Sequence, residues 1–195
     1  MKKLDYPFTP EQVGKLKLGE LVCVSGRVFT GRDRLHRYLA KGGESPVDMT
    51  NGAIFHCGPL VIQCNGAWRV LAAGPTTSMR HERYMPAVVA RHGIRVIIGK
   101  GGMGEATRKV CAEHGCVYLQ AVGGSGALVA SRISEVRAVH FLDRFGPTES
   151  LWELVFTNLE AVVTIDAQGR SLHDRIRHSS RRILRNLLTR AEQYA

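Results

Sequence analysis

The chain has 195 residues, of which 44% are hydrophobic and 23% charged, and its formal net charge is +10. This composition is typical of a globular protein with a buried core and excludes a disordered or fibrous chain. No apolar run is long enough for a membrane span and the start lacks the apolar segment of a secretory signal, so we expect one cytoplasmic domain over residues 1–195.

In the first third of the chain, strand patterns alternate with turns. Residues 20–30 predict a strand, and residues 31–43 predict a short helix that two glycines close. Residues 43–52 have the composition of a loop. Residues 53–74 predict two or three short strands separated by Gly-Pro and Asn-Gly turns, and the run Val70–Ala73 reads as a buried strand. This part of the chain is therefore expected to be hairpin-like.

From residue 84 onward, predicted helices and strands alternate. Their order is helix 84–93, strand 94–99, helix 103–115, strand 116–122, a glycine turn with a small-residue helix at 123–133, and strand 135–143. Strands joined by helices of about ten residues run parallel, because a crossover needs that much chain. A pair of strands, 151–158 and 161–169, follows. We predict an α/β fold with a mixed, partly parallel sheet in β/β/α layers.

The last segment, about residues 170–195, is basic and amphipathic. It carries seven arginines against Asp174 and Glu192. Its apolar residues recur at helical spacing: Leu172, Ile176, Ile183, Leu184, Leu187, Leu188 and Ala191. We interpret it as a helix with a solvated arginine face whose apolar stripe packs on this domain or on a partner. Contact with nucleic acid is the less favoured alternative.

The cysteines do not form a recognisable metal or disulfide pattern. Five are present, Cys23, Cys57, Cys64, Cys111 and Cys116, without a C-x-x-C pair. We interpret them as reduced structural residues and expect this chain by itself to ligate neither zinc nor an iron–sulfur cluster. His56 is likewise interpreted as a structural histidine, and no spacing favours a catalytic triad of Ser78, His81 and Asp143.

Three turns at predicted strand ends carry cations. The sequence GPTTSMR, residues 74–80, places hydroxyls beside Arg80; GKGGMG, residues 99–104, places Lys100 before a helix whose N-terminus favours anions; and TGRD, residues 30–33, contains Arg32. Ligands of open α/β sheets bind beyond the carboxyl ends of parallel strands. If the three turns face one another, they form a pocket for a small acid with more than one carboxylate. The glycines of residues 123–127 carry no cation and indicate close backbone packing.

The motifs TGRD, AIFHCGP, GPTTSMR and GKGGMG, in that order and followed by PTESLW and VVTIDAQG, resemble the C-terminal part of the class I, iron–sulfur-dependent fumarate hydratases over about residues 10–175. The β subunit of the tartrate dehydratases is a close relative. The resemblance implies a swivelling β/β/α domain that closes over a [4Fe-4S] cluster ligated by a partner α subunit and not by this chain. It implies a substrate-binding role for Arg32, Thr76, Arg80 and Lys100, a catalytic role for Thr77, and no metal ligand here. His81 stands where the family often has methionine.

The sequence is thus interpreted as the β subunit of a hydro-lyase that interconverts fumarate and malate, a reaction of the tricarboxylic acid cycle, in an α2β2-type or homodimeric assembly without a membrane. Two alternatives stay open. One is a hydro-lyase β subunit for L-tartrate or for mesaconate, a methylated fumarate. The other, from a different class, is a non-catalytic basic module that binds an acidic metabolite or nucleic acid.

Overall fold

Four parallel strands form the middle of the structure, a computed structural model that describes residues 1–192 and side chains through residue 189. They are β2 (Leu21–Gly31), β3 (Ala53–His56), β6 (Val96–Gly99) and β7 (Val117–Gln120). Helices α2 (Asp33–Ala40), α3 (Met85–His92) and α4 (Glu105–His114) lie between them in the chain, as parallel connections require. The βα alternation predicted from residue 84 onward is confirmed for α3, β6, α4 and β7.

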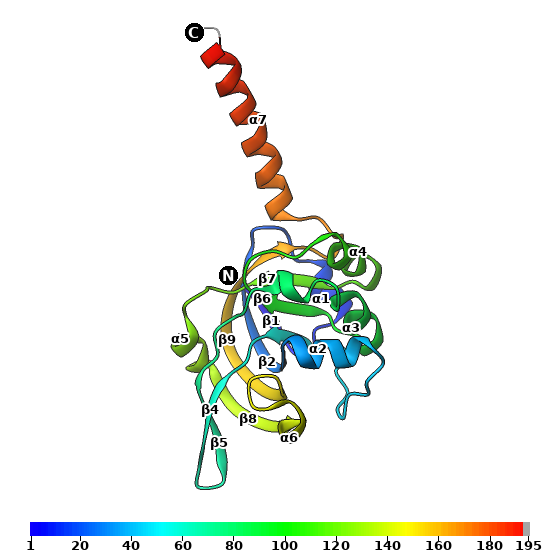
Figure 1. Cartoon of the computed structure of the whole chain (residues 1–195), viewed down its shortest axis with the longest axis vertical. Coiled ribbons are helices and arrows are strands. Elements are labelled where there is room, and N and C mark those ends of the chain that lie inside the picture. The colour runs from blue at the N-terminus through cyan, green and yellow to red at the C-terminus, as the bar shows by residue number, and fades with distance from the viewer. Residues whose placement is uncertain (193–195) are drawn as a thin grey trace.

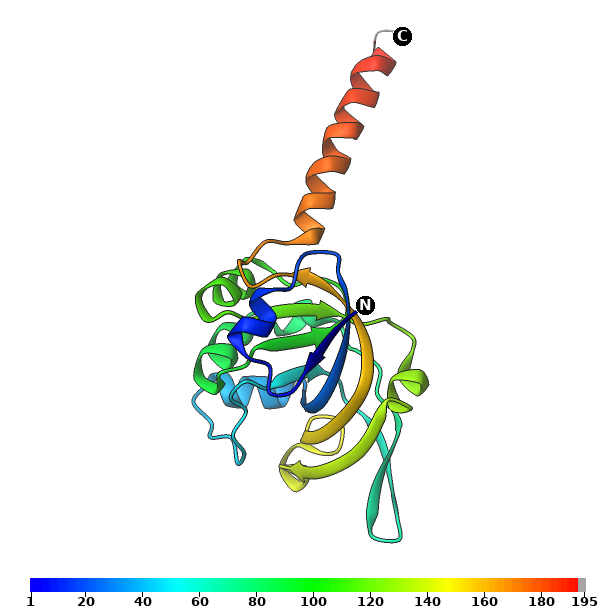
Figure 2. The same ribbon diagram turned by 180° about the vertical axis from the view of Figure 1, so that it is seen from behind.

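A second group of strands closes the sheet. The long strand β9 (Leu151–Ile165) is antiparallel to β2 along one edge and to both β7 and β8 (Ile133–His140) along the other. The short β1 (Lys2–Asp5) runs parallel to the start of β2. The strand order is β1-β2-β3-β6-β7-β9-β8 with an additional β2–β9 pairing. Figure 2 shows β9 as a curved ribbon that reaches the base of the C-terminal helix.

The predicted pair of final strands is wrong, because residues 151–165 form one strand. Asn158 interrupts the regular backbone with a φ of 55°, which asparagine tolerates better than most residues. Opposite it, the β2 register shifts between Val24 and Gly26. The Asn158 backbone N–H donates to Ser25 Oγ at 3.0 Å, so the ladder continues on both sides of the irregularity.

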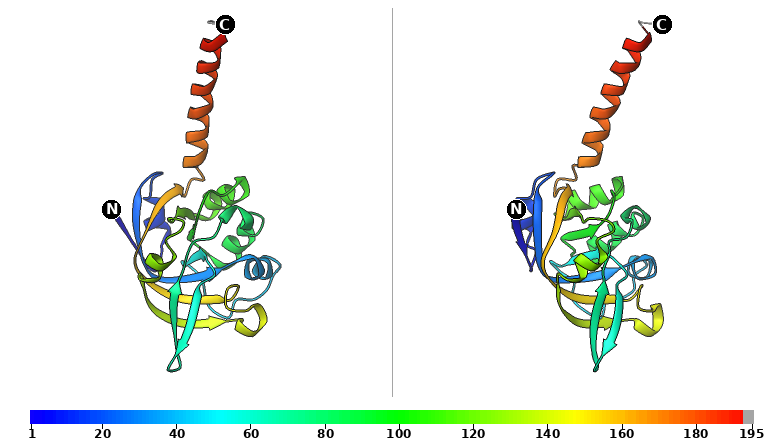
Figure 3. Two further views of the ribbon diagram at one scale, coloured as in Figure 1. Left: turned by 60° about the vertical axis from the view of Figure 1, so that its left-hand side comes forward. Right: turned by 90° about the vertical axis from the view of Figure 1, so that its left-hand side faces the viewer.

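The middle strands are buried on both faces. Because successive side chains point to opposite faces of a strand, Phe55, Ile98 and Leu119 enter one hydrophobic cluster. Their neighbours Ile54, Ile97 and Tyr118 enter the other. The first cluster lies between the parallel strands and β9, and the second lies under helices α2–α4. Figure 3 shows these helices on one side of the strands and β9 with β2 on the other, which confirms the predicted β/β/α layers.

The segment that follows β3 forms a hairpin that projects from the body (Figure 1). Its strands, β4 (Leu60–Cys64) and β5 (Ala67–Ala72), make a separate two-stranded sheet with Asn65 and Gly66 at positive φ in the turn. Leu60 and Leu71 are exposed, so the expectation of a buried strand at Val70–Ala73 is wrong except for Ala73. The hairpin-like arrangement predicted for the first third of the chain is confined to this segment, because β1–β2 and β2–β3 pair in parallel.

Helix ends follow the sequence closely. Helices α3 and α4 end at Gly93 and Gly115, whose φ angles of 61° and 60° are the left-handed values that glycine adopts most readily. Pro86 lies in the first turn of α3, where its missing N–H breaks no helical hydrogen bond. The remaining helices are short: α1 (Pro10–Gly14), the 3₁₀ turn η1 (Ser78–His81), α5 (Gly126–Ala130) and α6 (Leu142–Phe145).

The C-terminal helix α7 (Leu172–Glu192) points away from the body in every view (Figures 1 and 3). Its predicted apolar stripe does not pack on this domain, because Ile176, Ile183, Leu184, Leu187 and Leu188 are each 54–57% exposed. That expectation is wrong for this domain, while packing on a partner stays a prediction; Ala191 lies outside the described side chains. Among the described residues, no helix is long and apolar enough to cross a membrane.

Candidate active site

The predicted site residues gather at the carboxyl ends of the parallel strands. Arg32 directly follows β2 and is the N-cap residue of α2. Lys100 directly follows β6. Thr76 and Thr77 lie in the segment between the hairpin and η1, and Arg80 lies within η1. The predicted location at this edge of the sheet is therefore where the structure places all five residues.

The segment at residues 75–78 runs between the ends of β3 and β6 like a short extra strand. The Thr76 backbone N–H donates to His56 O at 2.7 Å. On the other side, Lys100 N donates to Thr76 O at 3.2 Å and Ser78 N donates to Lys100 O at 3.1 Å. Thr77 and Lys100 are thus paired in parallel register. Both line one cavity of about 510 Å³, together with Gln120 and Gly123.

The side chains of this segment alternate in exposure. Thr77 is exposed, whereas Ser78 is fully buried. Ser78 Oγ lies 2.8 Å from His56 Nδ1 and 2.9 Å from the Tyr118 hydroxyl, which is itself 3.0 Å from Gly101 O. This buried network joins three strand ends and fixes the backbone that presents Thr77. A side chain at position 99 would collide with Ser78, since a Cβ there would be 1.9 Å from its Oγ, so Gly99 is required.

The Ser78–His56 pair is not a nucleophile and its base. Ser78 has no exposed surface, and His56 Nε2 faces Met85 Sδ at 3.3 Å where a catalytic triad needs a carboxylate. Burial, followed by the nearby His81, lowers the pKa of His56 well below its ordinary value. Burial also raises the pKa of Tyr118, so both groups are neutral. The interpretation of His56 as a structural histidine is supported.

Arg80 and Arg32 each lie near a carboxylate of this chain. Arg80 Nη2 is 3.5 Å from Asp33 Oδ2, and His81 Nδ1 is 3.6 Å from Asp33 Oδ1. Arg32 Nε is 3.5 Å from Glu149 Oε1. Burial lowers the pKa of His81 to about 4; Asp33 opposes this, and the two arginines add to it. His81 is therefore neutral near pH 7 and adds no charge of its own beside the two arginines.

A glycine makes room for Arg32. A Cβ at Gly58 would lie 2.7 Å from Arg32 Cδ and 2.5 Å from Thr148 O. The glycine of the HCGP motif therefore lets the arginine side chain cross the end of β3 toward Glu149.

A second glycine contact joins two turns that are distant in the sequence. Ala73 N donates to Gly126 O at 2.9 Å, and a Cβ at Gly126 would touch Gly74. The prediction of close backbone packing at residues 123–127 is confirmed.

The N-terminus of α4 is already occupied by a carboxylate of this chain. Glu82 accepts hydrogen bonds from Gly104 N at 2.7 Å, Thr107 N at 3.0 Å and Thr107 Oγ1 at 2.7 Å. Glu82 therefore takes two of the backbone N–H groups at this helix N-terminus and competes there with a substrate anion. A contact between the substrate and this helix N-terminus stays a prediction. In the GKGGMG turn, the charge that remains for a ligand is that of Lys100.

Two subsets of the five residues are in direct proximity. Thr76, Thr77 and Lys100 are joined by backbone pairing. Arg80 pairs with Asp33, the chain neighbour of Arg32, and neither arginine is part of the lining of the Thr77 cavity. Sequence reasoning missed Glu82 and Tyr118. Glu82 had a signal, since an acid two residues after Arg80 interrupts the basic turn. Tyr118 had none, because in the sequence it is one more apolar residue of a buried strand.

Comparison with known proteins points to one group. The family model described as "Fumarase C-terminus" matches residues 2–176. The "Putative fumarate hydratase class I" of Geobacillus stearothermophilus is 45% identical over 178 residues, which cover 91% of this chain and 34% of that protein. The "Putative L(+)-tartrate dehydratase subunit beta" of Methanocaldococcus jannaschii is 34% identical, covering 89% of this chain and 93% of that one.

A third relative has a similar extent. The "L(+)-tartrate dehydratase subunit beta" of Escherichia coli strain K12 is 33% identical over 175 residues, which cover 88% of this chain and 87% of that subunit. The chain thus spans about a third of the fumarate hydratase that it matches and most of each tartrate dehydratase subunit. Helix α7 lies almost wholly beyond the residues that the family model matches.

Proposed function

This chain belongs to the family of the fumarase C-terminus, and on that basis we propose that it is the β subunit of an iron–sulfur hydro-lyase that interconverts fumarate and malate. An α subunit is the partner that the proposal requires. The observation that carries it is the pairing of Thr77 with Lys100 at the end of β6, with Arg80 in the same segment and Arg32 at the end of β2, on the other side of β3.

This arrangement suits a dicarboxylate. Lys100 provides a point charge beside the exposed Thr77, and the two arginines provide planar N–H forks that bind carboxylates through paired hydrogen bonds. A substrate with a carboxylate at each end needs cations at two separated points. The Lys100 group and the Arg32–Arg80 group supply them, and the reacting carbons then lie between, within reach of Thr77.

Thr77 handles the proton in this proposal. Its hydroxyl makes no hydrogen bond within the described part of the chain, so it is free to contact substrate. An isolated threonine is a weak base, but a neighbouring ammonium group favours its charged form. This effect strengthens when water is excluded, because electrostatic interactions grow in a low-dielectric site. The side of the sheet that carries Thr77 is open, so a partner subunit that covers it would produce that change.

The implied four-iron cluster does not fit the cysteines of this chain. Cluster ligands are thiolates. Cys23, Cys57, Cys111 and Cys116 are buried, Cys64 is exposed, and the described residues contain no group of three His, Cys, Asp or Glu side chains that could hold a metal ion. Burial raises the pKa of Cys57 to about 12 and also raises that of Cys116. The proposal therefore assigns the cluster to the α subunit.

The identity of the dicarboxylate substrate is the most specific part of the proposal. Fumarate is preferred because the fumarate hydratase relative is 45% identical, against 34% and 33% for the two tartrate dehydratase subunits. Tartrate is the second candidate, since the chain matches those subunits over most of their own length. Both substrates carry two carboxylates, so the cationic groups described above serve either one.

Anaerobic co-expression with an α chain that carries three cluster cysteines tests the proposal. We expect a complex, of α2β2 type, that hydrates fumarate faster than it converts L-tartrate or mesaconate, and a colourless, inactive chain when it is purified alone. Stable iron–sulfur absorbance from this chain by itself would contradict the assignment of the cluster to a partner. A complex with verified cluster content and no turnover of any of the three acids would favour a binding module.

A further inference from the structure

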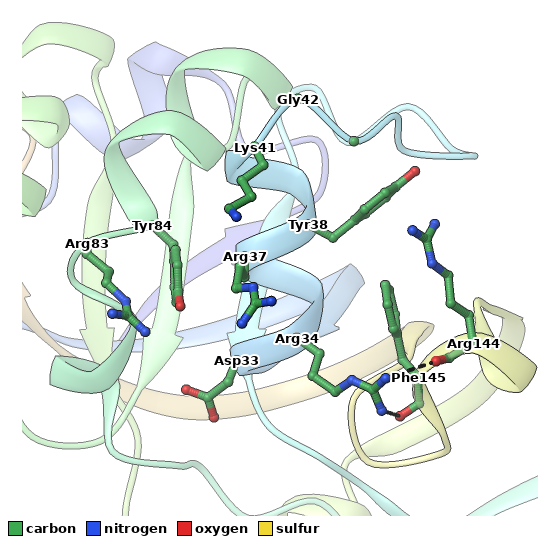
Figure 4. A pocket seen from close by; sticks show the side chains of 11 residues that line it. Asp33, Arg34, Arg37, Tyr38, Lys41, Gly42, Arg83, Tyr84, Arg144 and Phe145 are labelled. Carbon is green, nitrogen blue, oxygen red and sulfur yellow. Dashed lines mark hydrogen bonds between the residues drawn. The ribbon is translucent and has the colours of Figure 1, made fainter.

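A second cavity lies over the exposed face of α2. Its volume is about 670 Å³, within the range of about 300–1,000 Å³ that small-molecule sites occupy. In Figure 4, α2 forms the floor, Arg83 and Tyr84 at the start of α3 form one wall, and Arg144 and Phe145 of α6 form the other. Neither Thr77 nor Lys100 lines it, so it is separate from the Thr77 cavity, and it borders the proposed active site at Asp33, which pairs with Arg80.

The lining is strongly cationic. Its charged residues are one acid, Asp33, and five bases: Arg34, Arg37, Lys41, Arg83 and Arg144. Among the described side chains, none of the five bases has an ion-pair partner. The Arg34 guanidinium instead donates at 3.3 Å to the backbone oxygens of Phe145 and Arg144. Asp33 is itself in contact with Arg80 and His81. The positive charge around this cavity is therefore largely uncompensated.

Stacking orients part of this charge in advance. The Arg144 guanidinium carbon lies 4.4 Å from the Tyr38 ring centroid and 5.2 Å from that of Phe145. Arg83 lies 4.7 Å from the Tyr84 ring centroid in the same way. A guanidinium that stacks on an aromatic face keeps its N–H edges free for hydrogen bonds to an anion. Like charges gathered at one concave surface repel, and a bound anion removes that repulsion.

We propose that this cavity binds a di- or triphosphate group, either free or carried by a nucleotide. A phosphate chain presents many oxygens and several charges along its length, so it can contact bases from α2, from the turn before α3 and from α6 at once, as a single carboxylate cannot. Guanidinium groups bind phosphate oxygens through paired, charge-assisted hydrogen bonds. The cavity has room beyond the phosphates for a nucleoside. The proposal does not depend on the hydro-lyase activity.

Calorimetric titration of the full chain with ATP and with tripolyphosphate tests this site. The variant Arg37→Ala/Lys41→Ala removes two exposed bases from the floor and leaves the buried face of α2 intact. We expect it to weaken binding of both ligands by about tenfold or more, since each lost hydrogen bond involves a charged group. The control Arg69→Ala/Arg182→Ala removes the same charge from the hairpin and α7, and should bind like the wild type.

The two ligands distinguish the sources of the phosphate. Equal affinity for both supports a free polyphosphate, and tighter binding of ATP supports a nucleotide. Binding should also weaken as salt is raised, because the exposed charges are screened. Absence of binding by either ligand to the wild type would overturn the proposal, as would unchanged binding by Arg37→Ala/Lys41→Ala. If wild type binds neither ligand and that variant loses the α subunit instead, the cationic surface is a protein interface.

Discussion

At the scale of residues, the neighbouring hydroxyl residues Thr77 and Ser78 differ in exposure and therefore in role. Thr77 faces the cavity shared with Lys100, whereas Ser78 turns inward to His56 and Tyr118. Alternation along an extended segment produces this division, because successive side chains point to opposite sides. Thr77 is therefore available for substrate, and Ser78 is a positioning residue that holds the segment in place.

Thr77 substitution tests the catalytic assignment. In the reconstituted complex, Thr77→Ala should lower kcat by about 10²-fold or more with a much smaller change in KM, since the cations that bind the carboxylates stay. Thr77→Ser keeps a hydroxyl and should retain more activity. Thr157→Ala, an exposed change on β9, is the matched control and should leave kcat unchanged. Cluster content must be equal in all samples. A near-normal kcat for Thr77→Ala would remove this residue from the chemistry.

Three buried histidines make the fold sensitive to acid. The rings of His36, His56 and His81 have centroids 4.6–5.0 Å apart and no exposed surface. Burial is the largest cause that lowers the pKa of each, in His81 to about 4. In the unfolded chain histidine titrates near pH 6.5. Between these values the unfolded state binds more protons, so stability is full above about pH 6.5 and falls as the pH drops toward 4.

The variant His81→Met measures one part of this effect. Urea unfolding between pH 7 and pH 5 should show a smaller loss of stability than in wild type, by up to about 1.4 kcal/mol per pH unit for the single proton removed. The charged groups near His81, namely Asp33, Arg80 and Arg32, and the two other histidines, His36 and His56, stay in place. His114→Met, at an exposed position, is the control and should keep the wild-type slope. An unaltered slope in His81→Met would show that His81 does not titrate between the two states.

At the scale of elements, the first turn of α4 depends on Glu82. This residue comes from the segment just after η1 and accepts three hydrogen bonds from Gly104 and Thr107. A Cβ at Gly104 would lie 2.7 Å from Glu82 Oε1, so glycine is needed for the carboxylate to approach. The contact joins the turn that carries Arg80 to the turn that carries Lys100. It therefore stabilises both parts of the candidate site at once.

Replacing the cap should cost measurable stability. Glu82→Gln loses the charge and places an amide N–H₂ against a backbone donor, so we expect about 1.5–3 kcal/mol of destabilisation in urea unfolding. Glu105→Gln removes a charge from the same helical turn, where the carboxylate is exposed and paired only with Lys109. That control should cost less than about 0.5 kcal/mol. Equal losses in the two variants would mean that the effect is a helix-dipole effect and not a specific cap.

At the scale of the whole molecule, a closed set of strands carries a projecting helix. The body ends at Ser171, whose side chain accepts from Asp174 N at 3.3 Å, and Asp174 pairs with Arg108 of α4. Beyond this anchor the helix leaves the body with its apolar stripe exposed. Such a stripe next to a partly basic surface is typical of a docking segment. In the proposed complex, the α subunit is the partner for it.

Truncation after Asp174 tests this role. The body should unfold at the wild-type temperature, because the deleted side chains that the structure describes, those of residues 175–189, are exposed. Affinity for the α subunit should fall by about tenfold or more, as expected for the loss of even one buried leucine. Leu184→Ser/Leu188→Ser should reproduce the loss, and Arg181→Ala/Arg182→Ala should not. Loss of salt-sensitive RNA binding with unchanged assembly would move the nucleic-acid alternative ahead.

The sequence by itself determined the order of elements from residue 84 to residue 143, because glycine helix ends and buried apolar runs are local signals: Gly93, Gly115 and Val96–Gly99 act through their own backbone and side chains. It also placed the five candidate residues at strand ends. It could not show that residues 151–165 stay one strand, since Asn158 is accommodated by Ser25 from a distant part of the chain.

Only the tertiary structure decided which polar and charged side chains are engaged in contacts within the chain and which remain available to a ligand. Glu82 caps α4, Asp33 meets Arg80, and Lys100 pairs with Thr77 through contacts between residues 20 or more positions apart. Such contacts depend on how strands and helices pack, which no local pattern encodes. For the same reason the sequence correctly predicted an amphipathic helix at α7 but did not predict that its apolar stripe is exposed. An apolar stripe indicates that the helix packs against another surface, and it does not indicate which surface that is.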